Sequence, residues 1–324
     1  MATLNMSDQM TALEIVKRAN NPDAWRILEI MARTNEMLTD VPAYEANNGT
    51  INKVLVRKTK PEGKTRIYNR GVGRTATQTK EHMDRIAMMT AYSLVDASMV
   101  AHSGNINAAR MSEAQAIIEG MGLTQSELLI YGDGSRDDEF DGLMARLNDP
   151  NDPCFIDMGG TNNGDGTGEL TSLFLCAIGK NQFHLIYPKG SSSVGVKHVD
   201  KGIETVTDEN GGEYEAYRSY FEAQFGIAVP NPESIIRLAN IPKDMTGDDL
   251  VDRILAAKRK LPKGATTYAM YSNQGILIKI DKAARDKGNV VHMQADPWGK
   301  EITHIREIRC RQMDVILDTE SRVA

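Results

Sequence analysis

The residues INKVLVRKTKPEGKTRIYNRGVGRTATQTK (51–80) set the expectation for the whole chain. From Ile51 the side-chain pattern has a period of two, which is typical of a β-strand, and a turn signal follows at Pro61-Glu62-Gly63. A second extended run at 65–68 follows this turn, so the stretch predicts a long β-hairpin. Two-stranded hairpins are barely stable alone. We therefore expect this one to find partners outside its own core, on another subunit.

This stretch is strongly basic. It holds nine Lys or Arg residues against one acidic residue, Glu62, so it carries a formal charge of +8 while the remainder carries −14. Such a cluster fits either nucleic-acid binding or pairing with an acidic surface on a neighbouring subunit. Single-strand binders interleave aromatic residues with charge, and Tyr68 is the one aromatic residue here, which favours the neighbouring subunit. The expected contact residues are Lys53, Arg57, Lys58, Arg66, Arg70 and Arg74, together with Trp25.

Length and composition describe an ordinary folded protein. The 324 residues are 41% hydrophobic and 25% charged, and no stretch approaches the roughly 18 consecutive apolar residues of a membrane helix. The first residues lack the basic and apolar regions of a secretory signal, so we expect folding in the cytoplasm and no membrane association. The three widely spaced cysteines, Cys154, Cys176 and Cys310, predict small buried reduced side chains.

Helical patterns predict an N-terminal arm and a long helix. Two short patterns lie between residues 11 and 38, and helices this short must dock on their own domain or on a neighbour. A helix is expected over residues 81–101. A longer helix is expected from Ser112 to about residue 131, because Ser112 and Gln115 have the spacing of a capping box.

Extended patterns dominate after the acidic, turn-rich residues 133–153. Glycine-rich turns separate the expected strands, and a helix opened by Thr246 and two aspartates is expected over 246–260. The expected strands cover residues 154–158, 172–178, 183–187, 214–221, 226–229, 266–270, 276–280 and 302–317.

A search for chemistry finds no complete motif. Gly63-Lys64-Thr65 looks like the end of a phosphate-binding loop, but Lys58 stands where its first glycine belongs. The glycine-rich run 159–166 is not followed by a helix, and the acidic run from Asp133 lacks the glycine and the last glutamate of a calcium loop. The six histidines have no metal-binding spacing, and no nucleophile motif occurs. We expect no catalytic residue, no cofactor and no metal.

Several short motifs follow one another in order. They are TNEML (34–38), FDGL (140–143), FIDMGGT (155–161), TSL (171–173), YPKGS (187–191), RLANI (237–241), DVIL (314–317) and TE (319–320). In these motifs the chain resembles the podovirus-type major capsid proteins of tailed bacteriophages, over nearly its whole length. The resemblance implies an α+β chain with the Hong Kong 97-like fold. It divides the chain into an N-terminal arm (1–48), an extended β-hairpin loop (49–82), a peripheral domain (83–235 and 302–324) with a spine helix at about 112–131, and an α/β axial domain (236–301).

The same resemblance implies a structural function rather than catalysis. Copies of the chain are expected to assemble into pentamers and hexamers of an icosahedral head, which encloses double-stranded DNA without sequence-specific binding. Implied partners are other copies, a separate scaffolding protein and the portal protein, and a decoration protein is left open. The subunit would assemble in the bacterial cytoplasm and end in the virion, without covalent crosslinks, and its arm and hairpin would be mobile before assembly. Two alternatives stay open: an encapsulin-like nanocompartment shell and, in a different class, a soluble hydrolase or nucleic-acid-binding protein.

Overall fold

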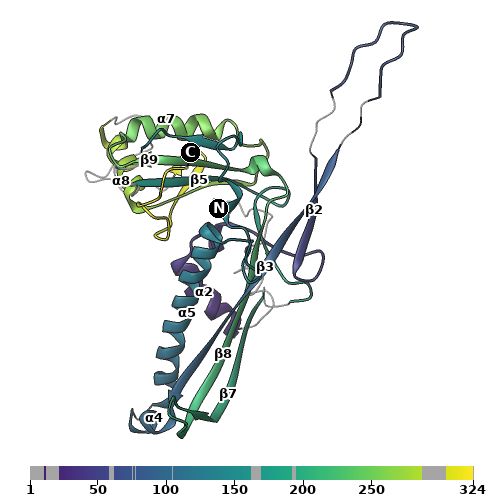
Figure 1. Ribbon diagram of the computed structural model, residues 1–324. Coiled ribbons are helices and arrows are strands. Elements are labelled where there is room, and N and C mark those ends of the chain that lie inside the picture. The colour runs from purple at the N-terminus through teal and green to yellow at the C-terminus, as the bar shows by residue number, and fades with distance from the viewer. Residues whose placement is uncertain are drawn as a thin grey trace, which may run out of the picture.

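The computed structural model describes residues 11, 22–57, 62–74, 76, 78–103, 105–161, 169–191, 195–286 and 304–323. Two six-stranded sheets, one elongated and one compact, make up the body, and a narrow ribbon of chain extends away from it (Figure 1). In chain order the elements are α2 (Pro22–Thr34), α3 (Met37–Asp40), β1 (Ala43–Glu45), β2 (Ile51–Arg57), β3 (Thr79–Asp96), α4 (Ala97–Ser103), α5 (Ile106–Tyr131), α6 (Leu143–Arg146), β4 (Phe155–Asp157), β5 (Leu170–Ile178), β6 (His184–Tyr187), β7 (Val196–Thr207), β8 (Glu213–Ala228), the 3-10 turn η1 (Pro232–Ser234), β9 (Ile235–Pro242), α7 (Gly247–Lys258), β10 (Thr267–Ser272), α8 (Gln274–Asp286), β11 (His304–Ile305) and β12 (Ile308–Gln312).

The elongated sheet is organised by β3, a strand of 18 residues. The strand order is β1-β6-β8-β3-β2, and β7 also pairs with β8. Residues 79–85 of β3 pair antiparallel with β2, whereas residues 86–96 pair antiparallel with β8. The same strand therefore belongs to the ribbon at one end and to the body of the sheet at the other (Figure 1).

The helix expected over residues 81–101 is wrong, because this segment is β3 as far as Asp96 and only the seven-residue α4 follows. Side chains along β3 alternate in exposure: Ala87 and Ser93 are buried, whereas Met88 and Leu94 are exposed. The segment is rich in Met, Ala and Leu, which favour helix in isolation. Pairing with β8, which lies far along the chain, overrides that preference.

The predicted hairpin is present, but its second strand differs from the expected one. Residues 51–57 form β2 as expected, and their partner is the start of β3 rather than residues 65–68, which lie in an irregular loop. The local pattern also fails to reveal β7. It predicts two strands where β8 runs without interruption from Glu213 to Ala228.

The long helix is confirmed and starts earlier than expected. α5 begins at Ile106, where the Asn105 side chain accepts a hydrogen bond from the Ala108 amide at 3.1 Å. The capping box expected at Ser112 is wrong, because Ser112 lies inside the helix. Asn105 is an equally good capping residue, so the true start follows the same physical rule about two turns earlier.

The compact sheet has the strand order β11-β12-β10-β5-β9-β4. Its helix α7 is confirmed, and the Thr246 hydroxyl accepts a hydrogen bond from the Asp249 amide at its start. The strand expected over 276–280 is wrong: these residues lie in α8, whose first turn is capped by Asn273 accepting from the Ile276 amide at 3.0 Å. Three apolar residues in a row, followed by Lys279 and Ile280, fit either a short strand or part of a buried helix, so the local pattern could not separate the two.

The C-terminal strand lies in the compact sheet. β12 pairs parallel with β10, and β10 pairs antiparallel with β5. The resemblance puts residues 83–235, which include the spine helix, and residues 302–324 in one peripheral domain. In the structure, β4, β5 and β12 from these residues share a sheet with strands of residues 236–301. Every residue of β5 is buried, and β5 pairs with β9 on one side and with β10 on the other. The central strand of the compact sheet therefore comes from outside residues 236–301.

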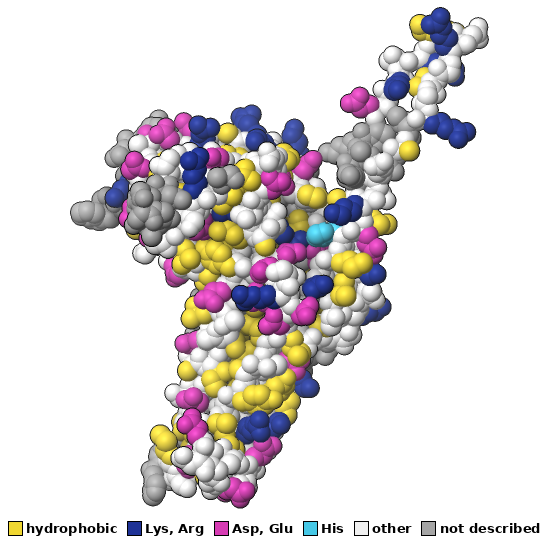
Figure 2. Space-filling view, in the orientation of Figure 1, with side chains coloured by type: hydrophobic (Ala, Val, Ile, Leu, Met, Phe, Trp, Pro, Cys, Tyr) yellow, Lys and Arg dark blue, Asp and Glu magenta, His cyan; other side chains and the backbone are white. Residues whose placement is uncertain are grey.

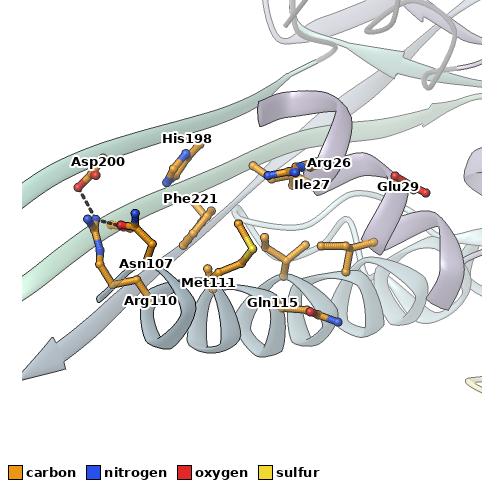
Figure 3. Close-up of a pocket in the computed structure, with 14 residues that line it drawn as sticks. Arg26, Ile27, Glu29, Asn107, Arg110, Met111, Gln115, His198, Asp200 and Phe221 are labelled. Carbon is orange, nitrogen blue, oxygen red and sulfur yellow. Dashed lines mark hydrogen bonds and ion pairs between the residues drawn. The ribbon is translucent and has the colours of Figure 1, made fainter. Parts of the chain in front are cut away.

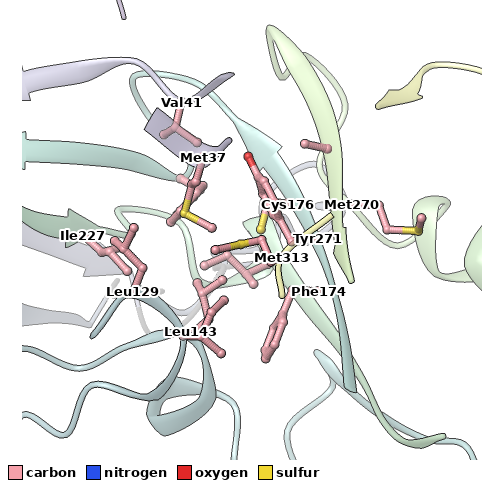
Figure 4. Packing of buried hydrophobic residues seen from close by; sticks show 14 of the residues in the cluster. Met37, Val41, Leu129, Leu143, Phe174, Cys176, Ile227, Met270, Tyr271 and Met313 are labelled. Atoms are coloured by element: carbon pink, nitrogen blue, oxygen red, sulfur yellow. The ribbon is translucent and has the colours of Figure 1, made fainter. Parts of the chain in front are cut away.

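A single cluster of buried apolar side chains joins the two sheets (Figure 4). Leu129 of α5 and Ile227 of β8 approach it from the elongated side, while Phe174 and Tyr271 come from the compact sheet. All three cysteines are buried, as the sequence predicts. Because one core serves both sheets, the body should unfold as a unit.

A buried ion pair lies at the junction between the sheets. Arg237 of β9 donates from Nη2 to Glu320 Oε2 at 3.5 Å, and the two side chains are 1% and 5% exposed. Arg237 also donates to the Leu147 carbonyl at 3.1 Å, and Glu320 accepts from Tyr131 Oη at 3.0 Å and from Ser172 Oγ. The network connects the end of α5, β5, β9 and the C-terminal segment. Burial raises the pKa of Glu320 above its ordinary 4.5, although its hydrogen bonds and Arg237 oppose that rise.

The described part of the N-terminal arm packs on its own chain. Leu28 and Met31 of α2 and Leu38 of α3 are fully buried, and α2 packs against α5. Asp40 accepts hydrogen bonds from Arg309 at 2.9 Å and from Arg311 at 2.7 Å, which ties α3 to β12. The arm was expected to dock either on its own domain or on a neighbouring subunit, and residues 22–40 dock on their own domain.

A second charged cluster fixes the root of the ribbon. Arg146 of α6 donates from Nη2 to the buried Asp84 Oδ1 at 2.7 Å, and His82 Nε2 lies 3.1 Å from the same oxygen. Arg146 also donates to the Asp141 carbonyl at 2.9 Å. Burial favours the neutral form of Asp84, but His82 and Arg146 outweigh it and hold the pKa of Asp84 below its ordinary 3.8. The cluster thus anchors β3 where it leaves the body.

We expect Arg237→Met to destabilise the fold by about 3–5 kcal/mol, because it leaves Glu320 buried without its cation. Urea unfolding near neutral pH measures this loss. The loss should shrink as pH is lowered through the raised pKa of Glu320, since protonation removes the unpaired charge. Arg253→Met on the exposed side of α7 is the control and should change stability by less than about 0.5 kcal/mol. An equal effect of both substitutions would contradict the role assigned to Arg237.

We expect Asp84→Asn to cost about 1.5–3 kcal/mol near neutral pH, because it removes a charge-assisted hydrogen bond from a buried site. A carboxyl with a lowered folded-state pKa contributes stability above its unfolded value and loses it as pH falls through the folded value. The difference between parent and variant should therefore begin to shrink below pH 3.8 and be lost once the pH lies below the lowered folded-state pKa of Asp84. Urea titrations across this range measure it, and a difference that stays constant with pH would show that Asp84 acts only through packing.

Candidate assembly interface

The ribbon has almost no core of its own. β2 pairs only with β3, and the chain beyond them continues into a loop that reaches far from the body (Figure 1). Every described residue of this loop, 62–74, is exposed. An extension that contributes nothing to its own domain must be stabilised from outside, so the ribbon is the first candidate for a contact between subunits.

The structure brings most of the predicted contact residues together on this ribbon. Lys53 lies on β2, where its Nζ is 3.5 Å from Glu81 of β3. Arg66, Arg70 and Arg74 lie in the loop and are exposed, and Figure 2 shows basic side chains at the tip. Within the described part of the chain, no carboxylate lies within 4.0 Å of these three guanidinium groups. The charge they carry is therefore available to a partner.

Three predicted residues cannot be judged from their side chains. Arg57 ends β2 and Trp25 lies in α2, away from the ribbon, but both side chains fall outside the described residues. Lys58 lies wholly outside them. Their contact roles stay predictions.

The loop also exposes two apolar side chains, which the basic charge pattern of the sequence does not indicate. Ile67 is 72% exposed and Tyr68 is 92% exposed, at a turn where Asn69 has a φ of 66°. Asparagine tolerates this left-handed conformation better than most residues, so the turn presents its neighbours outward without large strain. Aromatic and arginine side chains together are the usual energetic centre of protein interfaces.

A second exposed apolar surface lies on the outer face of the elongated sheet. Met88, Tyr92 and Leu94 of β3 are exposed there, and Tyr92 stacks obliquely on Tyr220 with 5.1 Å between ring centroids. The Arg218 guanidinium lies 4.5 Å from the Tyr92 ring centre. Sequence reasoning missed this surface, because reading the segment as a helix separated Leu94 from Met88 and Tyr92. The alternation of exposed and buried residues from Ala87 to Leu94 is the signal that identifies it.

A groove of about 570 Å³ lies between α2, α5 and strands β7 and β8 (Figure 3). Ile27, Met111 and Phe221 give it apolar walls. At one end Arg110 donates to Asp200 at 2.5 Å, and this bond holds the pKa of Asp200 below its ordinary value. The groove offers apolar contact beside an ion pair that is already satisfied.

Two further observations bear on the kinds of site that the described residues form. No three metal-ligating side chains come together among them. No helix within these same ranges is long and apolar enough to cross a membrane.

Comparison with known proteins identifies relatives over the whole length. Residues 20–324 match the family model of the major capsid protein GP7. A chain in the cryo-EM structure of bacteriophage epsilon15 is 26% identical, with a TM-score of 0.70, and the match covers 100% of this chain and 99% of that one. No significant match among the curated proteins was found.

Two more distant structures show lower similarity. The bacteriophage JBD30 capsid is 10% identical over 87% of this chain and 91% of its own, with a TM-score of 0.45. The SrpI encapsulin of Synechococcus elongatus PCC 7942 is 10% identical over 76% of this chain and 94% of its own, with a TM-score of 0.43.

The epsilon15 match covers both sheets, the long helix and the ribbon, so the expected Hong Kong 97-like capsid fold is confirmed. The resemblance to podovirus-type capsid proteins is confirmed as well. Because the family match extends over nearly the whole sequence, this chain belongs to the major capsid protein GP7 family and is a structural subunit of a phage capsid.

Proposed function

We propose that this subunit builds an icosahedral phage head by binding neighbouring copies through its basic ribbon. The observation that carries the proposal is the exposed loop 62–74, which holds Lys64, Arg66, Arg70 and Arg74 against a single acidic residue, Glu62. Its apolar side chains Ile67 and Tyr68 gain free energy by leaving water, and its charges can orient it on an acidic partner.

The contact is proposed to be head-to-tail. A surface that binds a different surface on the next copy generates a closed ring when the rotation between copies is a whole fraction of a turn. Rings of five and six subunits, joined along their edges, then close a shell. The proposed function therefore depends on the binding free energy of many such contacts and not on the stabilisation of a transition state.

The other expected partners belong to the same proposal. A separate scaffolding protein would guide shell size, and a portal protein would occupy one vertex, with assembly in the bacterial cytoplasm before the subunit becomes part of the virion. A decoration protein remains an open partner. The absence of crosslinks between subunits is likewise proposed, and covalent ladders on a denaturing gel of mature particles would contradict it.

The shell is proposed to hold double-stranded DNA without binding it in a sequence-specific way. Outside the basic stretch the chain carries a formal charge of −14, which opposes adhesion of packaged phosphate to the wall. Tight, salt-sensitive binding of empty shells to duplex DNA would contradict this part of the proposal.

Expression of the chain in bacteria, with and without a candidate scaffolding protein, tests the proposal directly. Negative-stain electron microscopy and sedimentation should show hollow polyhedral particles or rings of five and six subunits. A compact monomer under every condition would contradict the assembly function.

Hydrogen exchange distinguishes the state of the loop before and after assembly. In the free subunit, amides of 62–74 should exchange about as fast as an unstructured peptide, because the described residues there are all exposed and lie outside the strands. In particles they should be protected. The fully buried β5 is the internal control and should be protected in both states. Strong protection of the loop in the free subunit would contradict the proposal that a neighbour stabilises it.

A further inference from the structure

We infer that His82 is an acid-sensitive element of the ribbon root, where its protonation loosens the contact between α6 and β3. The ribbon root is defined as residues 82–86 of β3, where the strand exchanges β8 for β2 as its pairing partner. The inference goes beyond the proposed assembly function, because it concerns how firmly the body of one subunit holds its own extension.

Two side chains share one carboxylate oxygen at the ribbon root. Asp84 Oδ1 lies 2.7 Å from Arg146 Nη2 and 3.1 Å from His82 Nε2. The same His82 nitrogen lies 3.1 Å from Arg146 Nη1. The other oxygen, Asp84 Oδ2, is buried and has no hydrogen-bond partner among the described residues. A second arrangement of hydrogen bonds is therefore open to this carboxylate.

The charge of His82 decides which of these contacts form. An unprotonated Nε2 accepts a hydrogen bond from Arg146, so a neutral ring gives Arg146 two side-chain contacts with β3. A protonated ring can only donate, so its bond with Arg146 is lost and two cations face each other. The imidazolium can still donate to Asp84, which lies on the same strand. Protonation thus replaces a bond between α6 and β3 with one inside β3.

A cavity beside His82 leaves room for the ribbon root to move. It has a volume of about 480 Å³ and lies between the ribbon and the body. Its apolar walls are Val56 on the ribbon and Ala145, Leu147, Val229, Pro232 and Ile235 on the body. Because apolar side chains do not fill this space, the polar contacts of Arg146 matter more for holding the root than they would in a closely packed interface.

The surroundings of His82 hold charges of both signs. Besides Asp84, the charged side chains that line the same cavity are Lys80, Asp141, Arg146 and Asp152. The residue opposite His82 on β2 is Val54, which is uncharged. On β6, His184 interacts with Asp84, but burial lowers the pKa of His184, so its protonation needs a lower pH than that of an ordinary histidine. Histidine is the side chain whose charge ordinarily changes between about pH 5 and 8, so mild acid acts on this cluster through His82.

Distance measurements between two spin labels test the inference in the full-length subunit. One label is placed at Leu55→Cys on β2, where the native side chain is 71% exposed, and the other at Glu113→Cys on the exposed side of α5. The three native cysteines are buried and should stay unlabelled. Dilution with unlabelled protein ensures that each distance comes from one subunit. Between about pH 7.5 and about pH 5.5 the distance distribution should widen about twofold, because the root is held less firmly.

Two substitutions of His82 have opposite expected results. His82→Gln gains no proton, and its amide oxygen can still accept from Arg146, so its distribution should stay narrow at both pH values. His82→Lys is positively charged at both, so its distribution should be wide at both. His304→Gln, on the exposed β11, is the matched control and should respond to pH like the parent. A second label pair, Glu113→Cys with Arg253→Cys, reports on the body and should not respond to pH, because one core joins both sheets.

Three results would each overturn the inference: a parent distribution that does not widen at the lower pH, a His82→Gln distribution that widens as much as the parent, or a body pair that widens together with the ribbon pair. If His82→Lys does not fold, the comparison of the parent with His82→Gln still decides. The measurement is made within single subunits. A chain that never assembles would therefore contradict the proposed function and leave this inference standing.

Discussion

A guanidinium and a carboxylate that are both withdrawn from water hold the body of this subunit together. Arg237 and Glu320 are 83 residues apart in sequence, and their partners Tyr131 and Ser172 come from two further segments. Burying either charge alone would cost several kcal/mol, so the segments can occupy the junction only together. Apolar packing around the junction supplies the driving force for folding. The ion pair restricts how α5, β5, β9 and the C-terminal segment can be arranged, because only an arrangement that brings the two charges together avoids burying one of them alone.

A body fixed in this way can carry an extension that contributes nothing to its stability. The Asp84–Arg146 pair anchors β3 at the edge of the body, and beyond that point β2 and β3 pair with each other and share the exposed Lys53–Glu81 ion pair. Loop 62–74 contributes no buried side chain to the core. Its sequence is therefore released from the demands of folding, and it carries a net positive charge, with Lys64, Arg66, Arg70 and Arg74 against Glu62, in a chain whose net charge is −6.

Sequence reasoning succeeded where the deciding signal is local. Thr246 begins α7, and the period-two pattern from Ile51 identifies β2, because a cap and a strand alternation need only neighbouring residues. It failed where distant pairing decides: β3 is stabilised as a strand by β8, more than a hundred residues away, against its own helix-favouring composition. The ion pair of Arg237 and Glu320 is invisible for the same reason. Most of the candidate interface was accessible, since the basic residues lie in one stretch.

The separation of folding from assembly has a physical consequence for how this protein avoids premature association. Binding between exposed charged groups grows stronger as salt is lowered and is weak for a single contact, because exposed ion pairs contribute little individually. If the ribbon binds a neighbouring copy as proposed, one such contact would therefore leave free subunits largely unassociated. Only when a ring closes are several contacts made at once by subunits whose relative positions are already fixed, and the effective concentration of each contact surface for its partner then rises sharply. Weak contacts on a rigid body would thus favour closed shells over random aggregates.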